Sequence, residues 1–257
     1  MQAVRFALDS TVLPLVTQSL PLAEAARRTL MGIYGRMGEG ALRPVSQVFS
    51  GKDAGGRPLS GHRHAFFLPT DEDGDGRLDH LTVWAPAGFG PNEMRAFDKL
   101  DALWRFGESR HPLRVLLLGA GTLEEMGGGP LACSKIWVSA TPYLATRHPK
   151  TRGRERVDLA DPGARARFLE QDLRAQLAVL RPGLAGEGAP ALTVEPLWDK
   201  DHVFRLAEGL RPIQFKRFRS KRSDDGGRRP AGAFRIIFDR EVQGPLCLGW
   251  SSHFGMG

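Results

Sequence analysis

The sequence predicts an α+β protein made of two consecutive modules. The chain has 257 residues, which is enough for one large domain or two small ones. Segments with strand-like alternation of apolar residues are interspersed with segments of helical periodicity, and this order begins again after a glycine-rich stretch at 121–129. With 41% hydrophobic and 25% charged residues, the chain can bury a core. Disorder, collagen and a coiled coil are therefore excluded for the chain as a whole.

Six elements are predicted in the first half of the chain. Val4, Phe6 and Leu8 alternate with more polar residues, as in a strand, and Pro91 occupies the first position of a helix. The elements are, in order, a strand over 3–8, a helix over 21–37, strands over 64–68 and 81–85, a helix over 91–106 and a strand over 113–118. This β-α-β-β-α-β order is that of a ferredoxin-like module, which we expect over residues 1–121.

The second half begins with the same order and then departs from it. Asp161 and Pro162 form a strong helix start, and leucines line one face of the following segment. The predicted elements are a strand over 136–141, a helix from Asp161, strands over 192–197 and 203–206, and a strand over 234–238. We expect a second ferredoxin-like, RRM-like module over residues 130–257. The two halves share no repeat at the level of residues.

Composition also limits the cellular setting. The longest aliphatic run, Val115–Leu118, is far shorter than the ~20 residues of a membrane span. Arg5 and Asp9 interrupt the apolar N-terminal stretch, which is not typical of a secretory signal. Two cysteines, Cys133 and Cys247, cannot form a disulfide framework. We therefore expect a cytoplasmic protein without a membrane partner.

The positive charge is concentrated in two segments. The net charge is +7, whereas Arg211–Arg229 alone carries +6 and Arg147–Arg156 carries +4. Such segments attract polyanions, most often nucleic acid, and Phe215 and Phe218 lie among the cations where they can stack on bases. A solvated surface without a partner is the alternative. The candidate RNA contacts are Arg147, Lys150, Arg152, Lys216, Arg217, Arg219, Lys221, Arg222, Arg228 and Arg229.

Two histidines are candidates for catalysis. His62 and His64 follow a glycine- and proline-rich loop at 50–58, and a histidine is the natural general acid or base near neutral pH. On a strand they would face the same side, so one could react while the other orients it. Structural roles are the alternative for both. The sequence does not choose between His62 and His64.

The acidic turn at 71–79 permits three interpretations. Asp71, Asp73, Asp75 and Gly76 match the opening of a calcium loop, and Asp79 fills its ninth position. The twelfth position is Thr82 instead of the usual glutamate. The segment is therefore a tight turn between strands, a structural cation site at Asp71, Asp73, Asp75 and Asp79, or a catalytic metal site shared with His62, His64 and His80.

The C-terminal segment 244–257 is rich in glycine. Glycines followed by serine and histidine allow close approach of the backbone to phosphates, which makes Gly249, Ser252, His253 and Gly255 candidate RNA contacts. The chain contains no G-x-x-x-x-G-K-[ST], no G-x-S-x-G and no C-x-x-C. It therefore lacks the sequence patterns of P-loop nucleotide-binding proteins, hydrolases with a nucleophile elbow and zinc ribbons.

Taken together, the tandem modules, a histidine after the first helix and the glycine-rich C-terminal segment resemble the RAMP superfamily of CRISPR-associated proteins. The similarity is most specific in GHRHAFFLP at 61–69 with the turn at 71–80, and in GPL at 244–246 with Gly249 and SHFG at 252–255. These segments resemble the subtype I-G (formerly I-U) fusion subunit, in which a module that binds the 5′ handle of the guide RNA precedes a repeat-cleaving ribonuclease. The resemblance is to the ribonuclease half and covers most of the chain.

This resemblance implies an endoribonuclease of antiviral defence that cuts CRISPR precursor RNA at its repeats. In the family, a base deprotonates the 2′-OH beside the cut without a metal or cofactor, leaving 2′,3′-cyclic phosphate and 5′-OH ends. His62 and His64 occupy the place of the family's base, and residues 244–257 that of its RNA-binding glycine loop. The resemblance also implies that the product, crRNA, is retained within a type I Cascade-type complex.

Two differences from the family and two other functions remain open. The family is expected to continue into a further apolar strand after the position of Gly257, and the acidic turn belongs to this subgroup only.

Lys52, Arg57 and Arg63 are candidates to offset charge in the transition state. The other functions are a non-catalytic guide-RNA-binding subunit and a metal-dependent phosphodiesterase built on the acidic turn.

Overall fold

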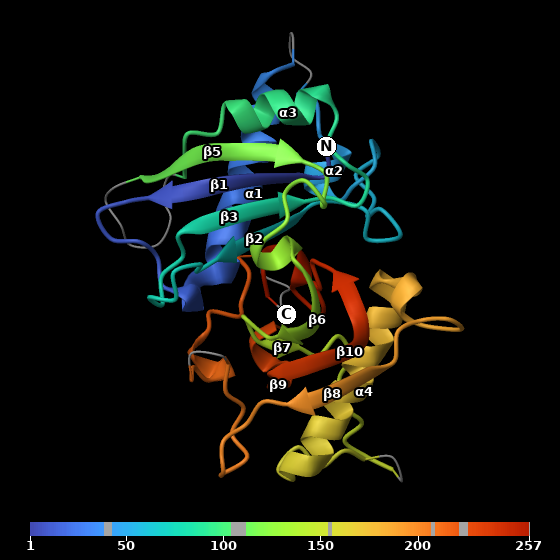
Figure 1. The fold of residues 1–257 in the computed structure, drawn as a ribbon. Helices are drawn as coiled ribbons and strands as arrows, with labels where there is room; N and C mark the ends of the chain where they lie inside the picture. Colours follow the sequence, from blue (N-terminus) through green and yellow to red (C-terminus); the bar gives the residue numbers. More distant parts are fainter. Residues whose placement is uncertain (39–42, 104–111, 154–155, 207–208, 221–225, 257) are drawn as a thin grey trace. The chain divides into compact units, whose positions relative to one another are not determined.

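The computed structural model describes residues 1–38, 43–103, 112–153, 156–206, 209–220 and 226–256. The chain divides into two compact units (Figure 1). Unit 1 comprises Met1–Ala132 together with His253–Gly255, and unit 2 comprises Cys133–Ser252 with Met256–Gly257. A short segment near the C-terminus is therefore part of the first unit.

Unit 1 contains a five-stranded antiparallel sheet. Its strands are β1 (Ala3–Asp9), β2 (Phe66–Thr70), β3 (His80–Trp84), β4 (Ala102–Leu103) and β5 (Leu113–Gly121), in the order β2-β3-β1-β5-β4. Val4, Phe6 and Leu8 are buried, which confirms the alternation predicted for the first strand. Phe67 and Val83 lie in register with Val4, so the same face of the three strands is apolar.

Among its described residues, unit 1 has three α-helices: α1 (Ser19–Arg36), α2 (Gln47–Ser50) and α3 (Pro91–Asp98). The apolar positions of α1, including Leu22, Ala26 and Leu30, are buried, and α1 runs behind the sheet in Figure 1. The ring of Phe49 on α2 meets that of Phe97 on α3 edge to face, with centroids 5.2 Å apart. These contacts close the core of the unit.

The helix predicted over 91–106 begins at Pro91 as expected, but the observed helix α3 is shorter and ends at Asp98. Ala102 and Leu103 form an edge strand instead, in which they pair with Arg114 and Leu113. Residues 104–106 lie outside the described part of the chain. Pairing with β5 outweighs the local helical periodicity, because it satisfies backbone groups and buries Leu103.

The strand predicted over 64–68 begins two residues later, at Phe66. Gly61 and His62 have φ angles of 84° and 48°, which are left-handed and not extended. The backbone N–H of Ala65 then donates to the carbonyl of Val48 on α2, 2.9 Å away. His62 and His64 therefore lie in a loop, and the prediction that they face the same side of a strand is wrong.

Unit 2 contains a three-stranded antiparallel sheet and one long helix. The sheet has the order β6-β10-β8, with β6 (Cys133–Val138), β8 (Leu192–Pro196) and β10 (Phe234–Gln243), and β7 (Tyr143–Leu144) pairs separately with β9 (Ala231–Gly232). The helix α4 (Pro162–Leu180) has Asp161 as its N-cap, as predicted, accepting from the backbone N–H groups of Gly163 and Ala164.

The strand predicted over 203–206 is wrong. Phe204 forms a single bridge to Trp198, because the chain reverses tightly between them. The carboxylate of Asp199 accepts from the backbone N–H of Val203 and from Arg205, which stabilises this turn. The remaining elements in the described part of the chain are 3-10 turns: Val16–Gln18, Gly129–Leu131, Pro182–Leu184, Pro212–Gln214, Gly226–Arg228 and Ser252–Phe254.

A buried carboxylate organises the interior of unit 2. Asp172 on α4 accepts hydrogen bonds from the Tyr143 hydroxyl at 2.7 Å and from the backbone and side chain of Thr146. Burial, and then the charge of Asp172, raise the pKa of Tyr143 above its ordinary value. Arg147 lies 3.3 Å from the same carboxylate. These contacts attach the β7 segment to the helix.

Both units combine helices with antiparallel strands, so the predicted α+β class is confirmed. Within the described residues, no helix is both long and apolar enough to cross a bilayer.

Candidate functional site: a histidine cluster in unit 1

Three histidine rings lie together in unit 1, although one of them is 189 residues from the nearest of the others in sequence. His62 and His64 come from the loop before β2, and His253 comes from the turn Ser252–Phe254. Nδ1 of His62 lies 3.1 Å from Nε2 of His253. Nδ1 of His253 lies 3.3 Å from the carbonyl oxygen of Ala65. These two contacts form a short chain from a backbone carbonyl through His253 to His62.

The ring of His253 lies between two other rings. Its centroid is 3.8 Å from that of His64 and 3.8 Å from that of Phe66, and all three rings are nearly parallel. The His62 ring is tilted by only 16° from that of His253, with centroids 5.4 Å apart, so the two rings meet edge to edge through their nitrogens. The stack sets the plane of His253, and His253 in turn orients His62.

Local backbone geometry supports the loop that carries His62 and His64. Gly51 ends α2 in the left-handed conformation, and the His64 ring packs directly against it. The backbone N–H of Ala87 donates to the carbonyl of Arg63, so the loop is also tied to the segment after β3. The positive φ of His62 is rare for a residue with a side chain, and such strain persists only where the surroundings impose it.

Arg27 adds a fixed positive charge near the cluster. Its guanidinium donates to the carbonyls of Phe49 and Ser50 at the end of α2, and it lies over the Phe254 ring at 5.7 Å. The C-terminal turn is therefore held by α1 as well as by β2. Gly255 in the same turn has a φ of 62°, and a Cβ there would lie 2.6 Å from Cδ of Pro69.

Burial keeps two of the three imidazoles neutral. Desolvation, followed by the charges of His62 and Arg27, lowers the pKa of His64 to about 4. Desolvation, followed by the neighbouring histidines, also places the pKa of His253 well below its ordinary value. His62, by contrast, is exposed to solvent. The cluster therefore presents one accessible imidazole, supported by two that stay neutral.

This arrangement suits general base catalysis. An accessible imidazole whose second nitrogen is held by a hydrogen bond has a defined orientation and one nitrogen left to take a proton. Lys52, Arg57 and Arg63, the predicted charge-offsetting residues, are all exposed on the same loop. His80 does not belong to the histidine cluster; it lies beside the acidic turn, with its Nδ1 2.9 Å from Oδ1 of Asp79.

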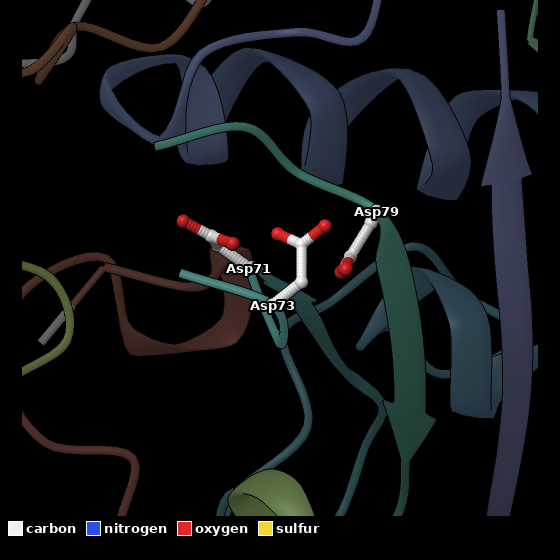
Figure 2. Close-up of side chains that lie close together, drawn as sticks. All are labelled: Asp71, Asp73 and Asp79. Atoms are coloured by element: carbon white, nitrogen blue, oxygen red, sulfur yellow. The ribbon is translucent and has the colours of Figure 1, made fainter. Parts of the chain in front are cut away.

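The acidic turn brings together three carboxylates between β2 and β3 (Figure 2). Asp71, Asp73 and Asp79 each offer an oxygen, and these oxygens lie within 4.8 Å of one another. Asp75 instead accepts from the backbone N–H of Arg77. Both oxygens of Asp71 accept backbone N–H groups, from Gly74 and Gly76 at 2.8 Å. These hydrogen bonds account for the acidic turn without an ion.

The predicted RNA contacts of unit 2 differ in how far they are exposed. Arg229 is buried and donates to the carbonyls of Ala145 and Thr146 while lying over the Trp250 ring, and Arg147 pairs with Asp172. Arg217 and Arg219 are half-buried, and Lys221 and Arg222 lie outside the described residues. The exposed members of the set are Arg147, Lys150, Arg152, Lys216 and Arg228.

The glycine-rich segment packs against the protein itself. Gly249 is buried with a φ of 95°, and a Cβ there would lie 2.8 Å from the carbonyl oxygen of Leu144. Ser252 is also buried. His253 and Gly255 belong to unit 1, in contact with the loop and β2. The glycines therefore have roles inside the fold that the sequence argument did not include.

Comparison with known proteins yields no assignment. No protein-family model matches the chain, and no curated protein matches it either.

Sequence reasoning missed the partnership of His62 with His253 and the supporting roles of Gly51 and Arg27. The only signal for it was the occurrence of histidine close to glycine in two short motifs, GHRH at 61–64 and SHFG at 252–255. Their contact depends on a chain path that spacing does not reveal.

Proposed function

We propose that the protein is a metal-independent endoribonuclease that cleaves CRISPR repeat RNA, with His62 as the general base. The observation that carries this proposal is the exposed His62 imidazole hydrogen-bonded to a neutral, stacked His253. His64 is a poorer choice for the base, because its low pKa makes it a weak proton acceptor and its Nδ1 is buried. The resemblance to RAMP ribonucleases supplies the substrate.

The proposed reaction is an internal transesterification. Nε2 of His62 takes the proton of the ribose 2′-OH as O2′ attacks the adjacent phosphorus. The bond from phosphorus to O5′ then breaks, and O5′ takes a proton from solvent. The products are a 2′,3′-cyclic phosphate and a 5′-OH. Lys52, Arg57 or Arg63 offsets the charge that develops on the phosphoryl oxygens.

RNA binding in this proposal draws on the exposed cations of unit 2. Lys150, Arg152, Lys216 and Arg228 contact the sugar–phosphate backbone of a folded repeat. Such contacts hold the product crRNA after cleavage, and we propose that the chain acts in the cytoplasm beside other subunits of a type I Cascade-type complex.

The finer fold assignment, two tandem ferredoxin-like modules, is part of the same proposal. Without the short edge strand β4, the order in unit 1 is β2-β3-β1-β5, which is the order that a β-α-β-β-α-β module requires. In unit 2, β6, α4, β8 and β10 correspond to the first three strands and first helix of such a module. The described residues of unit 2 contain no counterpart of the second helix and fourth strand.

Cleavage of a labelled repeat hairpin in EDTA tests the proposal. We expect wild type and His202→Asn, a control at an exposed histidine outside both basic segments, to cut at equal rates. We expect His62→Ala to lower the rate by about 10²-fold or more, and a 2′-deoxy ribose at the cut site to block cleavage. Full activity of His62→Ala, or products with 5′-phosphate ends, would contradict the mechanism.

A second candidate, a metal-dependent phosphodiesterase, is favoured by the Asp71, Asp73 and Asp79 cluster. It predicts loss of cleavage in EDTA and by Asp73→Asn, with 5′-phosphate products. A third outcome, in which the RNA is bound but never cut, would indicate a non-catalytic guide-RNA-binding subunit.

A further inference from the structure

The geometry points to His253 as a positioning residue that holds His62 in one tautomer, with the proton on Nδ1 and the lone pair on Nε2. The inference rests on the proposed function in that it names the reacting nitrogen of that site and the residue that orients it. It also makes a statement about the protein without RNA, so the two can be tested separately.

Nδ1 of His253 faces a backbone carbonyl group. Its partner is the carbonyl oxygen of Ala65 at 3.3 Å, and a carbonyl oxygen can only accept a hydrogen bond. Nδ1 of His253 therefore carries a proton. The stack between His64 and Phe66 prevents the ring from turning to exchange its two nitrogens without breaking contacts on both faces.

Nε2 of the same ring faces Nδ1 of His62. An imidazolium at this place would lie among His62, His64 and Arg27, with most of its surface removed from water, and the pKa of His253 is accordingly lowered. The ring is neutral, and a neutral imidazole with a proton on Nδ1 has a lone pair on Nε2. Nε2 of His253 therefore accepts a hydrogen bond.

The accepting nitrogen of His253 determines where His62 carries its proton. Nδ1 of His62 is 3.1 Å from Nε2 of His253, so the proton between them belongs to Nδ1 of His62. The lone pair of a neutral His62 is then on Nε2, for which no hydrogen bond is found within the described part of the chain. In water, neutral histidine prefers the opposite tautomer. His253 thus makes Nε2, the nitrogen farther from the backbone, the proton acceptor.

The left-handed backbone of His62 fits this role. A φ of 48° is unfavourable for a residue with a Cβ, and here it accompanies the hydrogen bond to His253. His64 contributes to the same geometry by covering one face of the His253 ring. In this view one imidazole of the cluster reacts, one orients it and one packs.

The test uses NMR of the full-length protein, labelled with ¹⁵N in histidine and treated with EDTA, above pH 7.5. Two-bond ¹H–¹⁵N spectra distinguish a protonated ring nitrogen from one that bears a lone pair, and His62→Gln assigns the signal. For His62 we expect a protonated Nδ1 and a lone pair on Nε2. The opposite pattern, or an equal mixture, would overturn the inference even if the protein cleaves RNA.

Two substitutions of His253 separate orientation from packing. His253→Phe keeps a ring between His64 and Phe66 but removes the acceptor, so we expect His62 to revert to the Nε2–H tautomer and cleavage to fall by 10- to 100-fold. His253→Gln places an amide oxygen near the former Nε2, and we expect it to restore the Nδ1–H tautomer and most of the rate. A rate loss in His253→Phe without a change of tautomer would also overturn the inference. If the tautomers behave as expected while no variant cuts RNA, the proposed function fails and the positioning role of His253 stands.

Discussion

The His64 ring rests on the backbone of Gly51. A Cβ at Gly51 would lie 2.9 Å from Cδ2 of His64, and Gly51 itself has a φ of 67°. Two separate constraints therefore exclude a side chain at this position: the left-handed backbone and the close approach of the ring. Through His64, the end of α2 supports the His253 ring and the catalytic candidate beyond it.

Gly51→Ala is expected to destabilise unit 1 and to disturb the cluster. The substitution should cost about 1–3 kcal/mol in the free energy of unfolding for backbone strain, with an added cost for displacing His64. Urea unfolding followed by circular dichroism measures the change. Gly56→Ala is the matched control, since Gly56 has a φ of 80° but a Cβ added there would meet nothing within 4 Å. Equal losses for the two variants would show that the contact with His64 contributes nothing.

The stability of the protein should fall on mild acidification because of His64. Its folded-state pKa of about 4 lies below its unfolded value of 6.5, so the unfolded chain binds the proton first. The contribution of His64 to the free energy of unfolding is therefore fully present above pH 6.5 and is lost as the pH falls from 6.5 towards 4. The loss due to His64 should be about 1–2 kcal/mol once solvent screening of a half-buried ring is allowed for.

Urea midpoints at pH 7.5, 6.0 and 5.0 for wild type and His64→Phe measure this contribution. The phenylalanine keeps a ring on Gly51 and His253 but cannot titrate, so its stability should decline less steeply over this range. Every other titratable group is common to the two proteins, so the difference between their profiles reports on His64 and on its effect on the pKa of His253. Parallel pH profiles would contradict the assignment of a low pKa to His64.

The exposed cations of the Arg211–Arg229 segment should account for part of the salt dependence of RNA binding. The double substitution Lys216→Ala with Arg228→Ala removes two exposed charges. We expect weaker binding and a slope of log affinity against log salt that is shallower by about 1.4–1.8, at roughly 0.7–0.9 per phosphate contact. The measurement is fluorescence anisotropy of a labelled repeat RNA at several salt concentrations.

The control for this experiment removes the same charge from unit 1. Arg95→Ala with Lys99→Ala takes two exposed cations from α3 and its C-terminal end. An unchanged slope is expected for this pair. If both double variants lose the same slope, binding reflects the net charge of the protein and the Arg211–Arg229 segment has no special part in it.

The acidic turn should keep its structure without calcium. Backbone N–H groups already occupy both oxygens of Asp71, and the Asp79 carboxylate accepts from the backbone of Glu72. We expect 1 mM Ca²⁺ to change the free energy of unfolding of the EDTA-treated protein by less than about 0.5 kcal/mol. A site with a Kd near 0.1 mM would add about 1.4 kcal/mol. An increase of that size, abolished by Asp73→Asn, would establish a structural cation site.

Local patterns predicted most of the elements correctly. The alternation around Phe6, the periodicity of α1 and the Asp161–Pro162 start of α4 each depend on a few neighbouring residues, and each appears in the structure. The errors arise where distant residues compete with local preference. Leu103 leaves the predicted helix to pair with β5, and the side chain of Asp199 turns the chain before Phe204 can extend a strand.

For the candidate site, too, the sequence identified individual residues, whereas the fold determined how they are arranged. The amino-acid sequence was enough to select His62 and His64, because imidazole chemistry and a neighbouring glycine-rich loop are properties of short segments. The distinction between them came from folding, which exposes His62, leaves His64 half-buried beside Gly51 and brings His253 from the far end of the chain to complete the cluster. Proton affinity and tautomer depend on desolvation and on hydrogen-bond partners within a few ångströms, and those partners are neighbours in space only after the chain has folded.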